Sequence, residues 1–278
     1  MFTIPFFVIA LPNFDPVFVS VGPLEIRWYA LAYTFGILAA WLYARTLARS
    51  KRLWGGPAPL TASDCDDFVL FCIPAVLLGG RLGYVLFYNP GYYAADPLEI
   101  FKPWTGGMSF HGALLLILFV EAAFARWRKI PFLSLTDIVS AGAPIGLFFG
   151  RIANFINGEL WGRASDVPWA IVFPDAGPSP RHPSQLYEAT LEGLMLFVVL
   201  ALLVRAGALK RRGTITAMFA IGYGVARIIC ELFREPDEQL GFLWSGVTMG
   251  MLLTLPVILV GLGILFLARR KPTSPSTE

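Results

Sequence analysis

The sequence is poor in metal-binding and charged residues. It has three cysteines and two histidines in 278 residues, and charged side chains make up only 15%. The spacing of Cys65, Cys72 and Cys230 forms no metal motif, and neither a histidine or carboxylate cluster nor a phosphate-binding glycine loop is found. The sequence therefore predicts no metal site, and none of the three cysteines is expected to be a nucleophile.

Hydrophobic residues take the place of the missing charge. They make up 56% of the chain, and the mean hydropathy of +0.64 exceeds what a soluble domain of this length requires. Windows of about 20 residues predict an all-α polytopic membrane protein with seven transmembrane helices, at 28–48, 67–89, 109–126, 137–157, 187–205, 213–234 and 244–268.

We expect one transmembrane domain over 1–278, since no polar linker interrupts the chain. Alternation in 17–28, broken at Gly22-Pro23, predicts a short ribbon within an outer loop region. The predicted outer segments are 1–27, 90–108, 158–186 and 235–243.

The positions of lysine and arginine predict the orientation. Fourteen of the 22 follow spans one, three, five and seven. By the positive-inside rule these ends are cytoplasmic, so the amino terminus lies outside and the carboxyl terminus inside. The net charge of +3 follows from this topology and indicates no nucleic-acid partner.

Three arginines lie inside predicted spans. Counted from helix starts near Asp67, Asp137 and Gly213, each of Arg81, Arg151 and Arg227 is fourteen residues in, roughly 21 Å along a core about 30 Å thick. His111 reaches a similar level from the opposite direction. Arginines near helix ends often only snorkel to the headgroups, but three together are costly without anions to meet. A lipid phosphate near the outer leaflet is the obvious anion.

The neighbours of two of these arginines are polar. Arg151 and Asn154 share a helix face, and Asn157-Gly158 is a good helix stop that leaves Glu159 at the water boundary. In span six, the polar stripe consists of Tyr223, Arg227 and Glu231. Glu231 is expected to neutralise Arg227. Arg81, between glycines, is expected to be an ion-paired arginine at a close helix contact.

The two histidines stand at predicted helix starts. His111, in GGMSFHGA, matches the depth of the arginines, and its reference pKa of about 6.5 suits a proton acceptor near neutral pH. His182, in RHPSQLYE, is interpreted mainly as part of a helix entrance. From that entrance Arg181, Gln185 and Glu188 could reach the site.

Four segments carry a family resemblance. GGMSFHGA, GRIANFINGELWGR, RHPSQLYE and IGYGVARIICELFREPD, in this order, closely resemble prolipoprotein diacylglyceryl transferases. The resemblance implies a bacterial inner-membrane enzyme that moves the diacylglyceryl group of phosphatidylglycerol to the lipobox cysteine of a prolipoprotein signal peptide. The products are a thioether and glycerol phosphate, and no cofactor is needed.

The resemblance also implies roles for individual residues. Arg151 and Arg227 would hold the headgroup and, with His111, carry the catalysis. The other implied substrate-binding residues are Tyr29, Asn154, Glu159, Gly162, Tyr223 and Glu231. Ala153 and Ala113 stand where the family usually has glycine, which concerns local packing. Asp137 also resembles a family position, but Ser134-x-x-Asp137 is interpreted as a capping box.

The chemistry fits these residue types. The departing phosphate gathers negative charge, which guanidinium groups stabilise with two parallel hydrogen bonds. A base raises the thiolate fraction of the attacking cysteine, and His111 is our candidate. The alternatives are an anionic-lipid transporter or flippase and another phosphatidyl-group transferase, since buried polar residues also mark transport paths.

Overall fold

The computed structural model describes residues 9–12, 15, 17–22, 24–102, 106–236, 241–244 and 246–270. The chain divides into two compact units. Unit 1 consists of Met1–Tyr43 and Val139–Glu278, and unit 2 of Ala44–Ile138.

Long apolar helices dominate the described chain, which confirms an all-α polytopic membrane protein. Six helical runs are long and apolar enough to cross a membrane. Helix α5 has 18 residues and lies where the third span is predicted; the count of seven spans stays a prediction. The long helices are α1 (Trp28–Arg49), α3 (Ala62–Phe87), α5 (Phe110–Trp127), α6 (Phe132–Ile156), α9 (Thr214–Glu231), α10 (Met249–Arg270) and the run α7 (Ser184–Glu188), η4 (Ala189–Met195) and α8 (Leu196–Arg205).

Short strands and turns connect these helices. The predicted ribbon is an antiparallel hairpin of β2 (Val17–Val21) and β3 (Leu24–Arg27); Pro23 lies outside the described residues. Two further strand pairs are β1 (Ile9–Ala10) with β4 (Ile171–Val172) and β5 (Phe242–Trp244) with β6 (Val247–Thr248). The short helices are α2 (Lys51–Trp54), α4 (Pro90–Ala95), η1 (Pro97–Phe101), η3 (Pro174–Ala176) and η5 (Ala208–Lys210).

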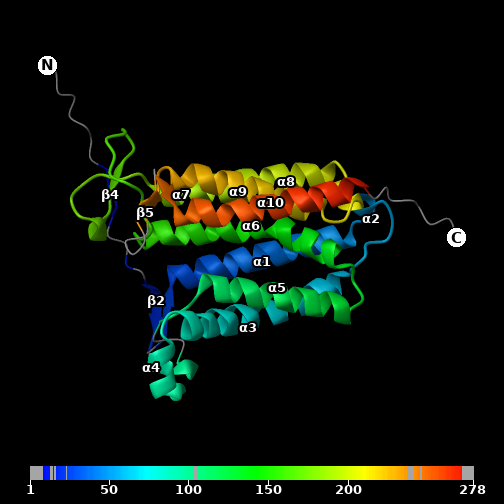
Figure 1. Ribbon diagram of the computed structural model, residues 1–278, viewed down its shortest axis with the longest axis horizontal. Helices are drawn as coiled ribbons and strands as arrows, with labels where there is room; N and C mark the ends of the chain where they lie inside the picture. Colours follow the sequence, from blue (N-terminus) through cyan, green and yellow to red (C-terminus); the bar gives the residue numbers. More distant parts are fainter. Residues whose placement is uncertain are drawn as a thin grey trace. The chain divides into compact units, whose positions relative to one another are not determined.

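In unit 1, α8, α9 and α10 run alongside one another with α6 (Figure 1). Helices α9 and α10 pack closely because Gly224 of α9 meets Ile258 of α10. A Cβ added at Gly224 would lie only 2.4 Å from the Ile258 side chain. The run from α7 to α8 is continuous but contains the π-helix η4.

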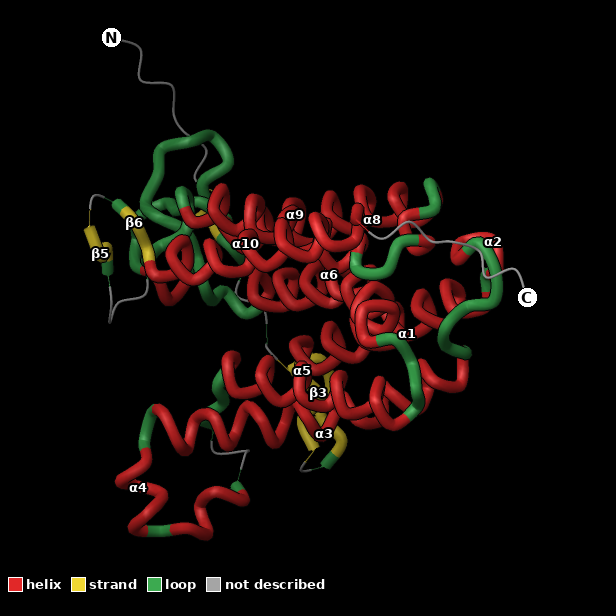
Figure 2. The backbone as a smooth tube through the Cα atoms, turned by 45° about the vertical axis from the view of Figure 1, so that its right-hand side comes forward, coloured by secondary structure: helices red, strands yellow, loops and turns green. Residues whose placement is uncertain are grey.

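In unit 2, α3 and α5 lie side by side (Figure 2). Glycines on both helices allow the contact. A Cβ at Gly112 would lie 2.3 Å from the Gly79 carbonyl oxygen and 2.7 Å from the Gly83 Cα. The close helix contact expected beside Arg81 is therefore confirmed.

The prediction that Arg81 is ion-paired is wrong for the described residues, none of which forms an ion pair with it. Its side chain is buried, and backbone carbonyls take the place of the expected carboxylate. The guanidinium donates to the carbonyl oxygens of Glu99, Ile100, Lys102, Gly106 and Gly107. Arg81 thus fixes the loop after η1, because five carbonyls satisfy its donors.

The predicted starts of two helices are also wrong. α3 begins at Ala62, where Thr61 and Asp64 form a capping box, and α6 begins at Phe132. Arg81 and Arg151 therefore lie nineteen residues after their helix starts. Measured from the other ends, Arg81, Arg151 and Arg227 lie six, five and four residues before the last helical residue. Each of the three arginines therefore lies four to six residues before the end of its own helix.

Asp137 is not a helix cap. Ser134 and Asp137 both lie inside α6 and are fully buried. The first turn of α6 bonds instead to the Pro131 carbonyl, which accepts from the backbone N–H groups of Ser134 and Leu135 at 2.8 and 3.3 Å. A proline before the helix therefore supplies the start that the capping-box interpretation assigned to Ser134.

Candidate functional site

Unit 1 gathers three arginines around two buried glutamates. Glu188 Oε2 lies 2.8 Å from Arg151 Nη2, 3.0 Å from Arg227 Nη1 and 3.6 Å from Arg234 Nη1. Glu192 lies 3.6 Å from Arg151 and 3.5 Å from Arg227. Both glutamate side chains are 0% exposed, while the arginines retain 13 to 18% exposure. The carboxylates thus lie on the buried side of the guanidinium groups.

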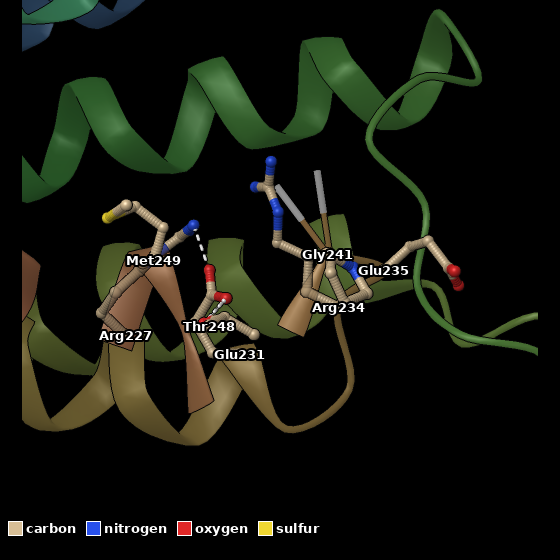
Figure 3. Close-up of a pocket in the computed structure, with 9 residues that line it drawn as sticks. Arg227, Glu231, Arg234, Glu235, Gly241, Thr248 and Met249 are labelled. Carbon is tan, nitrogen blue, oxygen red and sulfur yellow. Dashed lines mark hydrogen bonds and ion pairs between the residues drawn. The ribbon is translucent and has the colours of Figure 1, made fainter. Parts of the chain in front are cut away.

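Glu231 completes this arginine–glutamate cluster from α9. It is one helical turn after Arg227, and the two side chains form the expected ion pair. Thr248 Oγ1 donates to the other carboxylate oxygen at 2.6 Å, as Figure 3 shows. Gly250 makes room for the carboxylate, because a Cβ there would lie 2.5 Å from Glu231 Oε1.

A pocket opens beside this cluster. Its wall includes Arg227, Glu231 and Arg234, together with residues on both sides of β5 and β6 (Figure 3). Charged groups therefore border the space directly. The remaining lining residues are Glu235, Pro236, Gly241, Thr248, Met249 and Gly250.

The end of α6 holds Asn154 and Glu159 together. The predicted helix stop is confirmed, since α6 ends at Ile156 and Gly158 has a φ of 68°. Across this helix end, Asn154 Nδ2 of α6 donates to Glu159 Oε1 at 2.8 Å. Gln185 Nε2 donates to the Glu159 carbonyl at 2.7 Å. Helix α7 therefore anchors the turn that follows Arg151.

Gly162 connects the loop after α6 to the end of α9. Its backbone N–H donates to the His182 carbonyl at 2.9 Å, and it forms an antiparallel bridge with Arg234. Arg163 Nε and Nη2 donate to the carbonyls of Arg234 and Glu231, each at 2.9 Å. These bonds fix the residues that carry Arg234 into the cluster.

The two predicted tyrosines lie beside these groups. Tyr29 hydrogen-bonds Tyr33 at 3.1 Å and interacts electrostatically with Arg151 and Glu159. Tyr223, one turn before Arg227 on α9, interacts electrostatically with Arg227 and Glu192. The structure therefore gathers the predicted residues of unit 1 around Arg151 and Arg227.

His111 belongs to unit 2. It is the second residue of α5, and its side chain is exposed. The Ser109 side chain caps this helix by accepting from the Gly112 N–H at 3.2 Å. His111 thus stands on a capped helix start beside the close contact of Gly112 with α3.

His182 lies in an aromatic group outside the spans. Its Nδ1 is 3.1 Å from Tyr187 Oη, and Trp169 Nε1 donates a hydrogen bond to the same oxygen at 2.6 Å. The ring contacts Phe233 edge-on, with centroids 5.2 Å apart. Burial, and then the positive charge of Arg163, lower the pKa of His182 below its usual 6.5.

We expect this environment to make stability depend on pH. Below about pH 6.5 the unfolded chain protonates His182 while the folded chain keeps it neutral, so stability falls as the pH is lowered. The Tm of purified protein should therefore drop between pH 7 and pH 5. In His182→Gln the slope should be shallower, and an unchanged slope would contradict the assignment.

Sequence reasoning missed Glu192 and Arg234 and gave Glu188 only a marginal place. Glu192 lies within predicted span five, one turn after Glu188. A carboxylate inside a span is itself a signal for a functional site. In the described part of the chain, no group of three histidine, cysteine or acidic side chains is arranged to hold a metal ion.

The family model and three relatives that match this chain all carry the name of the same transferase. A family model described as prolipoprotein diacylglyceryl transferase matches residues 16–267. Three relatives carry the name phosphatidylglycerol–prolipoprotein diacylglyceryl transferase. The protein of Rhodopseudomonas palustris is 58% identical, with 99% of each chain covered. That of Methylocella silvestris is 58% identical over 97% of this chain and 99% of its own. That of Nitrobacter winogradskyi is 57% identical over 95% and 91%.

Proposed function

Because the chain belongs to the prolipoprotein diacylglyceryl transferase family, we propose that its arginine–glutamate cluster binds the phosphate of phosphatidylglycerol during transfer to a prolipoprotein cysteine. The chain is a multi-pass membrane transferase of lipoprotein maturation. The observation that carries the proposal is the pair Arg151 and Arg227, held by shared carboxylates near the ends of α6 and α9.

The reaction places specific demands on the site. The cysteine sulfur bonds to the glyceryl carbon, the bond from that carbon to the phosphate oxygen breaks, and glycerol phosphate leaves with the electron pair. Arg151 and Arg227 stabilise the charge that gathers on this phosphate, because guanidinium groups stay charged and donate paired hydrogen bonds.

His111 takes the thiol proton in this proposal. A neutral imidazole accepts a proton near neutral pH, and His111 is exposed at the start of α5. Glu231 is unsuited to this task, since Arg227 and Thr248 occupy both of its carboxylate oxygens.

The remaining predicted residues surround the headgroup. Asn154 and Glu159 hold each other at the end of α6. Tyr29 belongs to α1, and Tyr223 lies one turn before Arg227 on α9. Gly162 fixes the loop beside them. We assign these side chains to headgroup binding and Glu231 to holding Arg227.

The orientation proposed from the basic residues places the cluster on the outer side of the membrane in this proposal. With the amino terminus outside and the carboxyl terminus inside the inner membrane, the arginine-bearing helix ends face the outer leaflet. This is the side on which a translocated signal peptide presents its lipobox cysteine. The basic last turns of α1, α5 and α8, with Arg49, Arg126 and Arg205, support this orientation.

One experiment separates this function from its alternatives. Purified enzyme is incubated with phosphatidylglycerol and a lipobox peptide, and the peptide is analysed by mass spectrometry. A diacylglyceryl adduct on cysteine is expected. A transporter or another phosphatidyl-group transferase leaves the cysteine unmodified, and the absence of an adduct with folded, lipid-supplied protein would refute the proposal.

His111→Gln tests the base assignment in the same assay. Glutamine keeps polarity and approximate size but accepts no proton, so transfer should fall about 100-fold at neutral pH. The loss should shrink as the pH rises, because the free thiol ionises by itself near pH 8.5. Near-normal transfer by His111→Gln would remove His111 from this role.

A further inference from the structure

Glu188 and Glu192 have no role in the reaction described above. Both are fully buried, although carboxyl side chains are rare within membrane spans. Glu188 contacts three arginines and Glu192 contacts two of the same three. The two carboxylates together bridge Arg151 of α6 and Arg227 of α9 from the buried side.

The π-helix η4 brings both carboxylates to the same place. Helix α7 ends at Glu188, and η4 follows at Ala189–Met195. Single π turns inside helices occur often at functional sites because they change the direction of the side chains. Here the wider turn includes Glu192, so one short segment supplies two buried acceptors.

Gly193 sets how closely this turn approaches α6. A Cβ at Gly193 would lie 2.7 Å from Phe148 Cβ and 2.8 Å from Phe148 Cα. Phe148 is three residues before Arg151 and therefore on a neighbouring part of the same helix face. The glycine thus permits the approach that places Glu188 and Glu192 against Arg151.

Counted as formal charges, the cluster is balanced without a substrate. Three arginines face three carboxylates, counting Glu231. Arg151 uses only Nη2 in its ion pairs. Among the described residues, its Nε and Nη1 form no hydrogen bond. The two carboxylates therefore hold the Arg151 guanidinium through Nη2 and leave its Nε and Nη1 as donors for a ligand.

We propose that Glu188 and Glu192 are positioning residues, which hold Arg151 and Arg227 at the separation and tilt that match the departing phosphate. This inference rests on the proposed function. Donors fixed in advance need no reorganisation as charge develops, and this gives them their effect on rate. Glu192 is the better test, since its contacts are the longer ones and Glu188 remains to hold the helices.

Glu192→Gln should separate positioning from binding. The neutral amide has nearly the same shape, but it removes one formal negative charge from beside the arginines. An anionic lipid is then bound at least as well, while the loosened guanidinium groups stabilise the transition state less. We expect kcat to fall roughly 30- to 100-fold with no rise in the KM for phosphatidylglycerol. Gly193→Ala pushes η4 away from Phe148. Like Glu192→Gln, it should lower kcat without raising the KM for phosphatidylglycerol.

The matched control is Glu99→Gln, because Glu99 belongs to unit 2 and its carboxylate pairs with Lys102 Nζ at 2.5 Å. It should retain wild-type kinetics. An unchanged kcat in Glu192→Gln, or a raised KM with kcat unchanged, would overturn the positioning role. So would a lowered Tm whose loss of folded protein accounts for all the lost activity. If wild-type enzyme forms no diacylglyceryl adduct, the proposed function itself fails, which is a separate result.

Discussion

Replacement of Arg227 by lysine is expected to lower the rate of diacylglyceryl transfer about 1,000-fold, the upper range for loss of one charge-stabilising donor. Arg227 bonds Glu188 through Nη1 at 3.0 Å and Glu231 through Nη2. A lysine ammonium keeps the charge but is a single point, so it cannot bridge both carboxylates and also face a phosphate. The initial rate of adduct formation on a lipobox peptide measures the effect.

Arg205→Lys is the matched control for this change. Arg205 is exposed in the last turn of α8, so its replacement should leave the rate unchanged. Folded protein is compared by Tm, because a buried carboxylate that loses its partner also destabilises the fold. A rate within threefold of wild type for Arg227→Lys would show that charge alone is sufficient and would refute a paired hydrogen-bond role.

Much of the site was predictable because helix periodicity acts over short distances. The i, i+4 spacing of Arg227 and Glu231 predicts a pair that the structure confirms. The Asn157-Gly158 stop correctly predicts the end of α6. Both signals lie within a few residues of sequence, and apolar run length likewise indicates where the long helices lie.

The contacts between helices could not be predicted in this way. Glu192 reaches Arg151 and Arg227 because η4 widens its helix and packs against Phe148, and neither feature has a local pattern. Asp137 fails for a related reason, since a preceding Pro131 starts the helix and leaves the apparent capping box inside it. Local propensity was overridden in each case by the neighbouring backbone.

Gly162 is a position in the loop beside the site at which a single methyl group should strongly destabilise the protein. A Cβ there would lie 2.6 Å from the Phe233 carbonyl oxygen, 2.7 Å from His182 Cβ and 2.7 Å from the His182 carbonyl oxygen. Two of these neighbours are backbone atoms, and the bridge from Gly162 to Arg234 holds them in place. No flexible side chain is available to move aside.

Gly162→Ala should therefore lower the free energy of unfolding by about 3 kcal/mol, the upper range for overpacking, which corresponds to a fall in Tm of roughly 6 to 12 °C. Gly146→Ala is its control, because a Cβ at Gly146 meets nothing within 4 Å and alanine favours a helix. Its Tm should stay constant or rise. If both variants melt with the wild-type protein, the loop at Gly162 yields freely, and the bridge to Arg234 cannot be what fixes Arg234 beside Glu188.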